Sequence, residues 1–120
     1  MTVLQAVGLC DGLVHNTCTQ AQKVRWVEML EERIHRLVLG MFVPEPEAFV
    51  PIGEDLGREL LASGPFEDMY LYWLQAQVCY SQGEFSDYNA AIAQYNRLYL
   101  AFAADYGRTH MPKSRGRFRF

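Results

Sequence analysis

The chain has 120 residues, of which 50% are hydrophobic and 21% are charged, a composition that suits one globular domain. Its formal net charge is −3, but residues 1–107 hold fourteen acidic and six basic side chains, and residues 108–120 hold five basic ones. The acidic body argues against general nucleic-acid binding, and the sequence has no apolar run of the roughly 20 residues that a membrane span needs.

The cysteines and the N-terminus indicate a compartment. The three cysteines, Cys10, Cys18 and Cys79, are an odd number, and the N-terminus has neither the basic region nor the long apolar region of a signal peptide. We therefore expect reduced thiols in a cytoplasmic setting.

The first segment along the chain, Thr2 to about Val14, spaces its apolar residues close to the helical period. Gly8 and Gly12 weaken it as an isolated helix, so we expect it to depend on packing against other elements. Residues 15–17 indicate a break after it.

The second segment is the clearest predicted helix, because Thr19 and Gln22 fit the capping box that begins a helix. Its apolar residues recur every three or four positions, which predicts a core stripe opposite a solvated face. The stripe comprises Val24, Val27, Leu30, Ile34, Leu37 and Val38. The predicted solvated face comprises Lys23, Arg25, Glu28, Glu31, Glu32, Arg33 and Arg36. Gly40 stands where a left-handed residue would end the helix.

Residues 41–64 break the helical pattern with Pro44, Pro46, Pro51 and several glycines. We predict a long irregular loop or a short β-ribbon here, with one helical turn around residues 55–61 as a further option. So long a segment without regular structure is unusual in a small domain and is often functional.

Two further helices form a predicted antiparallel hairpin. Pro65 suits the first turn of the third helix, and Gly83 marks the turn that follows it. The fourth helix begins near Ser86, and its aromatic residues step by four and three positions, the 3.5-residue repeat of packed helices. Alanines fill many of the other positions, so a neighbour can approach closely.

The predicted fold class is therefore all-α: a small helical bundle with a C-terminal antiparallel helix hairpin and a long loop or short β-ribbon between the second and third helices. The candidate core residues are Trp26, Leu30, Ile34, Tyr70, Trp73, Tyr88, Ile92, Tyr95, Tyr99 and Phe102. Core packing is one interpretation of the tyrosines among them, and contact with a neighbouring subunit is the other.

Residues that carry catalysis or bind metals give only weak patterns. Glu32 and His35 form the Glu-x-x-His of di-iron bundles, but no second such pair is present, and we expect His35 to face solvent. Cys10, His15 and Cys18 match no common zinc spacing. The sequence also lacks nucleophile motifs and phosphate loops, so we predict no enzyme activity, no cofactor, no metal and no small-molecule substrate.

The last segment, residues 108–120, is basic and lacks periodicity, so we divide the chain into a helical domain, residues 1–107, and a tail that is disordered in the free protein. The tail is either a solvated end or an arm that folds on an acidic partner surface or along DNA phosphates. Its candidate interaction residues are Arg108, His110, Lys113, Arg115, Arg117, Phe118, Arg119 and Phe120.

A set of short motifs runs through most of the chain. They are Asn16 and Thr19, Lys23-x-x-Trp26-x-x-x-Leu30, Pro65-Phe66-x-x-x-Tyr70, Tyr80-x-x-Gly83-Glu84, Tyr88-Asn89, Tyr95-Asn96, and Tyr106-x-Arg108-Thr109-His110-Met111-Pro112. In these motifs the chain resembles a family of small proteins encoded in the structural gene clusters of tailed bacteriophages and prophages, near capsid and head–tail joining genes.

The resemblance implies a role in virion assembly, most like that of the helical head–tail connector (adaptor) proteins, which form a ring under the portal and pass the DNA channel to the tail. The partners that it implies are other copies of the chain and phage portal or tail proteins, with DNA contact through the basic tail as an option. It places the protein in the virion, and in the bacterial host cytoplasm during assembly. The alternative is a small nucleic-acid-binding or other protein-interaction accessory protein of a phage or prophage.

Overall fold

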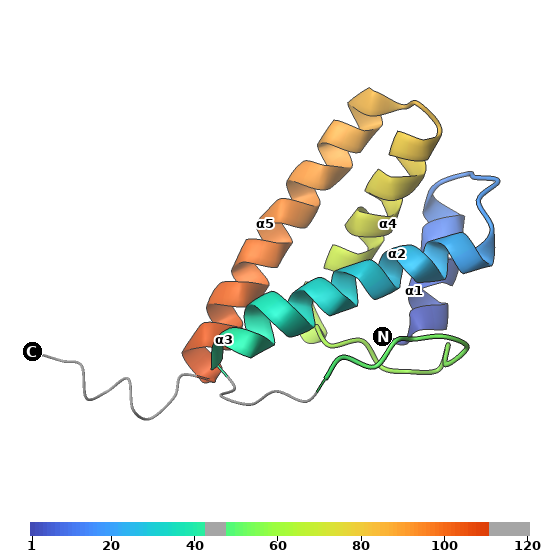
Figure 1. Ribbon diagram of the computed structural model, residues 1–120. Helices are drawn as coiled ribbons and strands as arrows, with labels where there is room; N and C mark the ends of the chain where they lie inside the picture. The colour runs from blue at the N-terminus through green and yellow to red at the C-terminus, as the bar shows by residue number, and fades with distance from the viewer. Residues whose placement is uncertain (43–47, 111–120) are drawn as a thin grey trace, which may run out of the picture.

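Helices account for most of residues 1–42 and 48–110, the two ranges that this computed structural model describes (Figure 1). In chain order the elements are α1 (Val3–Leu13), α2 (Gln20–Arg33), a π-helical segment (Ile34–Leu39), α3 (Gly40–Phe42), a 3-10 turn (Gly64–Phe66), α4 (Asp68–Ser81) and α5 (Phe85–Thr109). Neither described range contains a strand, which confirms the all-α fold class. In the same two ranges, no helix is both long and apolar enough to cross a membrane.

A capping box that we did not predict begins α1. The Thr2 hydroxyl accepts from the Gln5 N–H at 3.2 Å, and the Gln5 side chain accepts from the Thr2 N–H at 2.8 Å. This reciprocal pair satisfies two donors at the helix start and offsets the helix-weakening glycines. The inner face of α1 packs against α2 and α4, and its buried residues are Val3, Ala6, Val7 and Cys10.

One half of the predicted capping box is present in α2, where the Thr19 hydroxyl accepts from the Gln22 N–H at 3.1 Å. The helix does not end as predicted, however, because Gly40 has a right-handed φ of −62°. Its N–H donates to the His35 carbonyl five residues back, so a π-helical turn carries the chain straight into α3. This wider turn also changes the angular spacing of side chains, and Leu37, predicted to be core, is half exposed.

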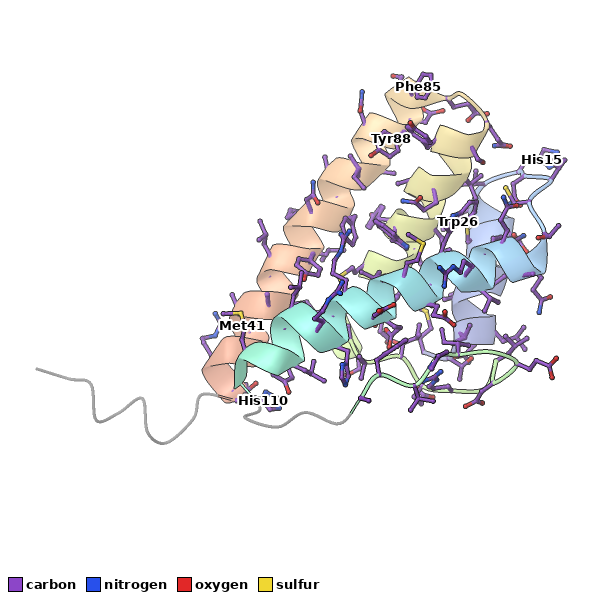
Figure 2. The ribbon with its side chains drawn as sticks, in the orientation of Figure 1. His15, Trp26, Met41, Phe85, Tyr88 and His110 are labelled. Atoms are coloured by element: carbon purple, nitrogen blue, oxygen red, sulfur yellow. The ribbon has the colours of Figure 1, made fainter. Side chains whose placement is uncertain are left out.

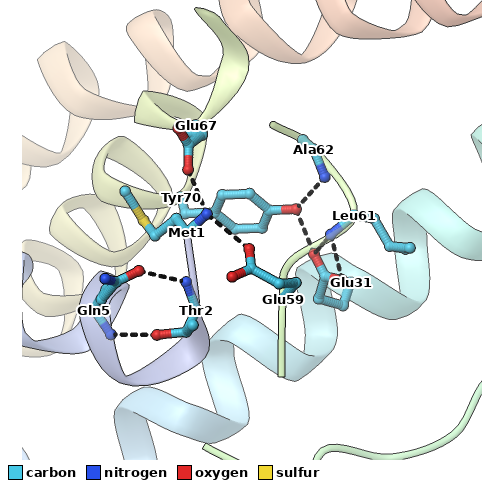
Figure 3. A network of polar contacts seen from close by, with 9 residues as sticks. All are labelled: Met1, Thr2, Gln5, Glu31, Glu59, Leu61, Ala62, Glu67 and Tyr70. Carbon is cyan, nitrogen blue, oxygen red and sulfur yellow. Dashed lines mark hydrogen bonds and ion pairs between the residues drawn. The ribbon is translucent and has the colours of Figure 1, made fainter. Parts of the chain in front are cut away.

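The described part of the long loop, residues 48–63, is irregular and contains no β-ribbon. It pairs instead with the N-terminus, through one antiparallel bridge between Thr2 and Glu59 and a hydrogen bond from the Leu60 N–H to the Met1 carbonyl at 2.9 Å. The Met1 ammonium lies between the Glu59 and Glu67 carboxylates at 3.0 and 2.5 Å (Figure 3). Pro44 and Pro46 lie outside the described residues.

This loop covers a part of α2 that we predicted to be solvated. Glu31 is only 4% exposed beneath the loop, whereas Lys23, 5% exposed, contacts Asp11 of α1 and Asn16 of the connection between α1 and α2. The Glu31 carboxylate accepts from the Leu61 N–H at 3.1 Å and from the Tyr70 hydroxyl (Figure 3), and the Glu28 carboxylate accepts from the Ile52 N–H at 3.0 Å. The carboxylates of α2 therefore satisfy backbone donors of the loop, which would otherwise be unpaired.

The hairpin of α4 and α5 forms as predicted. Gly83 makes the turn with a φ of +77°, a conformation that side chains with a Cβ rarely adopt. α2 crosses α4, and the π-helical segment reaches α5 (Figure 1). The hairpin helix runs on to Thr109, two residues beyond the predicted end of the helical domain at residue 107.

Most of the predicted core residues pack where α2 meets the hairpin. Leu30, Ile34, Tyr70, Trp73, Tyr95 and Phe102 are buried, and Trp26, Ile92 and Tyr99 are half-buried against them. The Trp73 indole N–H donates to the Trp26 carbonyl at 2.8 Å, and Arg33 donates to the Tyr95 hydroxyl at 3.0 Å. Tyr88 is the exception, because it lies at the hairpin turn, beyond the reach of α2.

Candidate interaction surfaces of α5

The long helix α5 forms one edge of the fold. Among the described elements it packs on α4, the 3-10 turn and the π-helical segment, and its other side faces solvent. Figure 1 shows the hairpin turn at one end of α5 and the exit of the chain at the other. Three surfaces follow from this position: the turn, the outer face and the exit end.

The hairpin turn exposes a cluster of three aromatic rings, which we call the tip cluster. Tyr80 is 60% exposed and Phe85 is 57% exposed, while Tyr88 is half-buried. The Tyr80 ring centroid lies 5.6 Å from that of Phe85 and 5.3 Å from that of Tyr88, in edge-to-face arrangements. Figure 2 shows the labelled pair Phe85 and Tyr88 at this end. Exposed aromatic rings held in fixed geometry are typical of protein–protein contacts.

The outer face of α5 carries little charge. The 25-residue helix contains four charged side chains, Asp87, Arg97, Asp105 and Arg108, and the last two pair with each other at 3.2 Å. Leu100 is 68% exposed. The remaining outer residues include the exposed alanines Ala90, Ala93, Ala101 and Ala104. The exposed polar residues Asn89, Gln94 and Asn96 complete this face, which is rich in small residues and weakly charged, so another protein can approach it closely.

The exit end of α5 is closed by local contacts of the predicted Arg-Thr-His motif. The His110 ring stacks on Tyr106, with centroids 3.7 Å apart and planes at 4°. The Thr109 hydroxyl donates to the Asp105 carbonyl at 3.1 Å, and Arg108 pairs with the Asp105 carboxylate. The motif therefore ends the helix in a defined geometry, and the tail leaves from this point.

A cleft of about 490 Å³ lies beside this end, where α5 meets the 3-10 turn. Its apolar lining includes Pro65, Phe66 and Phe102, and the two phenylalanine rings meet edge to face at 5.6 Å. Thr109 and His110 supply polar groups at the same cleft. Two motifs that are some forty residues apart in the sequence, Pro-Phe and Arg-Thr-His, thus form one surface.

Two of the eight predicted interaction residues lie within the residues that the structure describes. Arg108 and His110 are exposed at the exit end of α5. The others lie outside the described residues: Lys113, Arg115, Arg117, Phe118, Arg119 and Phe120. The tip cluster was missed as a surface, although the pattern Tyr80, Phe85 and Tyr88 around Gly83 could have indicated it.

The residues of the weak metal patterns have other contacts. His35 is half-buried against Phe49, with ring centroids 5.8 Å apart, and does not face solvent as predicted, because the loop covers it. Burial raises the pKa of the Cys10 thiol to about 11, and the Cys18 sulfur lies 3.6 Å from the Ser81 hydroxyl. Among residues 1–42 and 48–110, no group of three or more His, Cys, Asp or Glu side chains could hold a metal ion.

Two of the motif residues form a small polar network at the start of α2. The Lys23 ammonium contacts the Asp11 carboxylate at 2.6 Å and the Asn16 side-chain oxygen at 3.2 Å. The Asn16 oxygen also accepts from the Cys18 N–H at 3.2 Å. These contacts fix the connection between α1 and α2, so we assign these motif residues a structural role.

Comparison with known proteins identified no relative of the chain. A scan against protein-family models found no match, and neither the curated proteins nor the solved structures contain a significantly similar chain.

Proposed function

We propose that this chain is a non-enzymatic virion assembly protein, a head–tail connector (adaptor) subunit that forms a ring of identical copies and docks between portal and tail. The observation that carries the proposal is the outer face of α5, with its exposed Leu100, its alanines and few charges. A face of small residues with few charges lets a neighbouring protein approach closely without burying many ionised groups. The phage setting comes from the resemblance in the sequence motifs.

The positions of the motifs support an assembly role. Tyr80, Gly83 and Tyr88 lie at the hairpin turn, while Tyr106 and His110 lie at the exit end. A subunit in a ring contacts one neighbour on each side, and a connector contacts a further partner above or below. The two ends and the outer face of α5 offer separate surfaces for these contacts, so the function is mechanical.

Replacing Leu100 tests the outer face. Leu100→Ser removes an exposed apolar side chain from α5, and Val50→Ser is the matched control, because Val50 is as exposed but lies on the loop. We expect Leu100→Ser to reduce ring formation or portal docking, measured by light scattering. The free energy of unfolding, measured by thermal denaturation, should stay within about 0.5 kcal/mol of wild type, as for most surface changes. Equal assembly by the two variants would contradict the role of this face.

Removal of the tail tests the exit end. A chain that stops after His110 keeps the whole of α5 and its closing contacts. We expect it to fold as the full chain does and to fail to dock on a candidate portal protein. Completed assembly by the shortened chain would contradict a docking role for the tail. Loss of a salt-dependent affinity for DNA, with assembly unchanged, would instead favour the nucleic-acid-binding alternative.

A further inference from the structure

A second cleft lies at the opposite end of α5 from the tail. It has a volume of about 540 Å³ and is bounded by the end of α1, the connection to α2, and both helices of the hairpin. We call it the hairpin-end cleft, and the lining residues that matter here are Leu13, His15, Tyr72, Cys79, Glu84 and Asp87. Figure 2 shows the labelled His15 and Phe85 at this end of the molecule and His110 at the other.

The hairpin-end cleft is acidic, with Glu84 at the N-cap of α5 and Asp87 in its first turn, where the helix dipole favours negative charge. Glu84 and Asp87 form no ion pair with the described part of the chain, and the described lining contains no Lys or Arg. Burial raises the pKa of the nearby Cys79 thiol, and the charges of the same two carboxylates raise it further. The cleft also offers apolar contact area, because Leu13 is largely exposed and Tyr72 lies in the lining.

The chemistry that fits this cleft is a basic peptide with aromatic residues. Guanidinium groups pair strongly with carboxylates, and phenylalanine rings suit apolar and aromatic lining. The last ten residues of the chain have this pattern, because Phe118 and Phe120 alternate with Arg117 and Arg119. They follow Lys113 and Arg115.

The length of the tail favours a second copy as its source. At about 1.5 Å per helical residue, Asp87 lies roughly 33 Å along α5 from Thr109. Arg117 follows Thr109 by eight residues, which span at most about 29 Å when fully extended. Arg119 follows Thr109 by ten residues, which span at most about 36 Å, so the arginines of the same chain could reach Asp87 only with the tail almost fully extended along α5. A neighbouring copy has no such restriction.

We propose that the hairpin-end cleft of one copy binds the basic tail, residues 111–120, of a second copy. The contact joins the exit end of one α5 to the hairpin turn of the next, so it is a head-to-tail contact, which closes into a ring when the rotation between copies allows. The inference rests on the proposed ring assembly and names the contact between its subunits.

A labelled synthetic peptide of residues 109–120, titrated with the full-length chain and followed by fluorescence anisotropy, tests the contact. We expect the double variant Glu84→Gln/Asp87→Asn to bind the peptide about tenfold more weakly than wild type, since two charge-assisted contacts are lost. The matched control is Glu54→Gln/Asp55→Asn, the same charge change on exposed loop residues. Equal affinity of all three chains for the peptide would overturn the proposal.

A charge exchange tests the direction of the contact. The variant Glu84→Arg/Asp87→Arg should lose self-association, measured by mass against concentration, and adding Arg115→Glu, Arg117→Glu and Arg119→Glu to the same chain should restore it. Absence of restoration, with circular dichroism showing intact helices, would overturn the proposal.

The two proposals fail in different ways. If the cleft variants still form a ring with the portal as wild type does, this contact is overturned and the connector proposal stands. Cleft-dependent peptide binding by a chain that ignores the portal would support the contact and count against the connector role.

Discussion

The Glu31 carboxylate of α2 and the Tyr70 hydroxyl of α4 share a hydrogen bond inside the core, and each also accepts a backbone N–H from the loop between them. The donors are the N–H groups of Leu61, to Glu31, and of Ala62, to Tyr70 at 2.9 Å. The same stretch of loop leads into the 3-10 turn that lines the exit-end cleft. A buried polar pair therefore holds one wall of a candidate docking surface in place.

Tyr70→Phe removes one half of this pair. The Ala62 N–H would lose its buried acceptor and Glu31 would lose a hydroxyl donor, so we expect a loss of about 1–3 kcal/mol in the free energy of unfolding. Chemical denaturation measures it. Tyr72→Phe on the same helix is the matched control, because the Tyr72 side chain is only half-buried and stays outside this pair. A loss no larger than that of the control would mean that the pair contributes nothing to the fold.

Glu31→Gln isolates a pH dependence. Burial raises the pKa of Glu31 above its ordinary value of 4.5, although hydrogen bonds from Tyr70 and Leu61 oppose this. The contribution of Glu31 to stability is therefore fully present below pH 4.5 and is lost as the pH rises through the raised pKa. We predict that the difference in unfolding free energy, wild type minus Glu31→Gln, decreases as the pH rises from 4.5 through the raised pKa. A difference that is flat or increases with pH would contradict the prediction.

The two tryptophans should differ in their contributions. Trp73 is buried against Tyr95 at a centroid distance of 5.0 Å, so Trp73→Ala should cost about 3–5 kcal/mol. Trp26 is half-buried and its contact with Trp73 uses a backbone carbonyl, which Trp26→Ala retains. We expect a smaller cost for that change, on the order of 1–2 kcal/mol, because stabilisation scales with the area buried. Denaturation midpoints of the two variants give the comparison, and the reverse order would refute it.

Lys23→Met should change the titration of Asp11. The hydrogen bond from Lys23 lowers the pKa of Asp11 below its ordinary value of 3.8, so the pair stabilises the fold above that pH and the contribution is lost as the pH falls. Carboxyl-carbon NMR should show the Asp11 pKa rising towards 3.8 in the variant. Arg25→Met, which removes a different cation from the same helix, should leave that pKa unchanged. An Asp11 titration that is the same in wild type and Lys23→Met would show that the contact is absent in solution.

Helical spacing predicted α2 and the hairpin because it depends only on which residues must share a buried face. The same rule misplaced Lys23 and Glu31, since it assumes that a polar face meets water, whereas here the loop covers Glu31, and Asp11 and Asn16 contact Lys23. Gly40 was misread because a preference for left-handed helix ends is a tendency, and a π-helical turn satisfied its N–H instead. The partners of Lys23 and Glu31 come from other segments of the chain, so these contacts have no local signature in the sequence.

The candidate surfaces were predicted in part. Periodicity placed Tyr88 in the core because it continues the stripe of Tyr95 and Phe102, but at the turn Tyr88 lies beyond α2, and its ring packs on the exposed Tyr80 instead. The alanines of α5 leave room for a neighbouring helix, and Ala90, Ala93, Ala101 and Ala104 are exposed on its outer face. The exit-end and hairpin-end clefts were not predicted, because each combines residues from distant parts of the chain.

The most direct test of the connector proposal is the mass of the full-length chain, measured by light scattering over a range of concentrations with and without a candidate portal protein. We predict a large closed ring, formed by the chain alone or only when the portal is added. A strict monomer at every concentration, unchanged by the portal, would contradict the proposal.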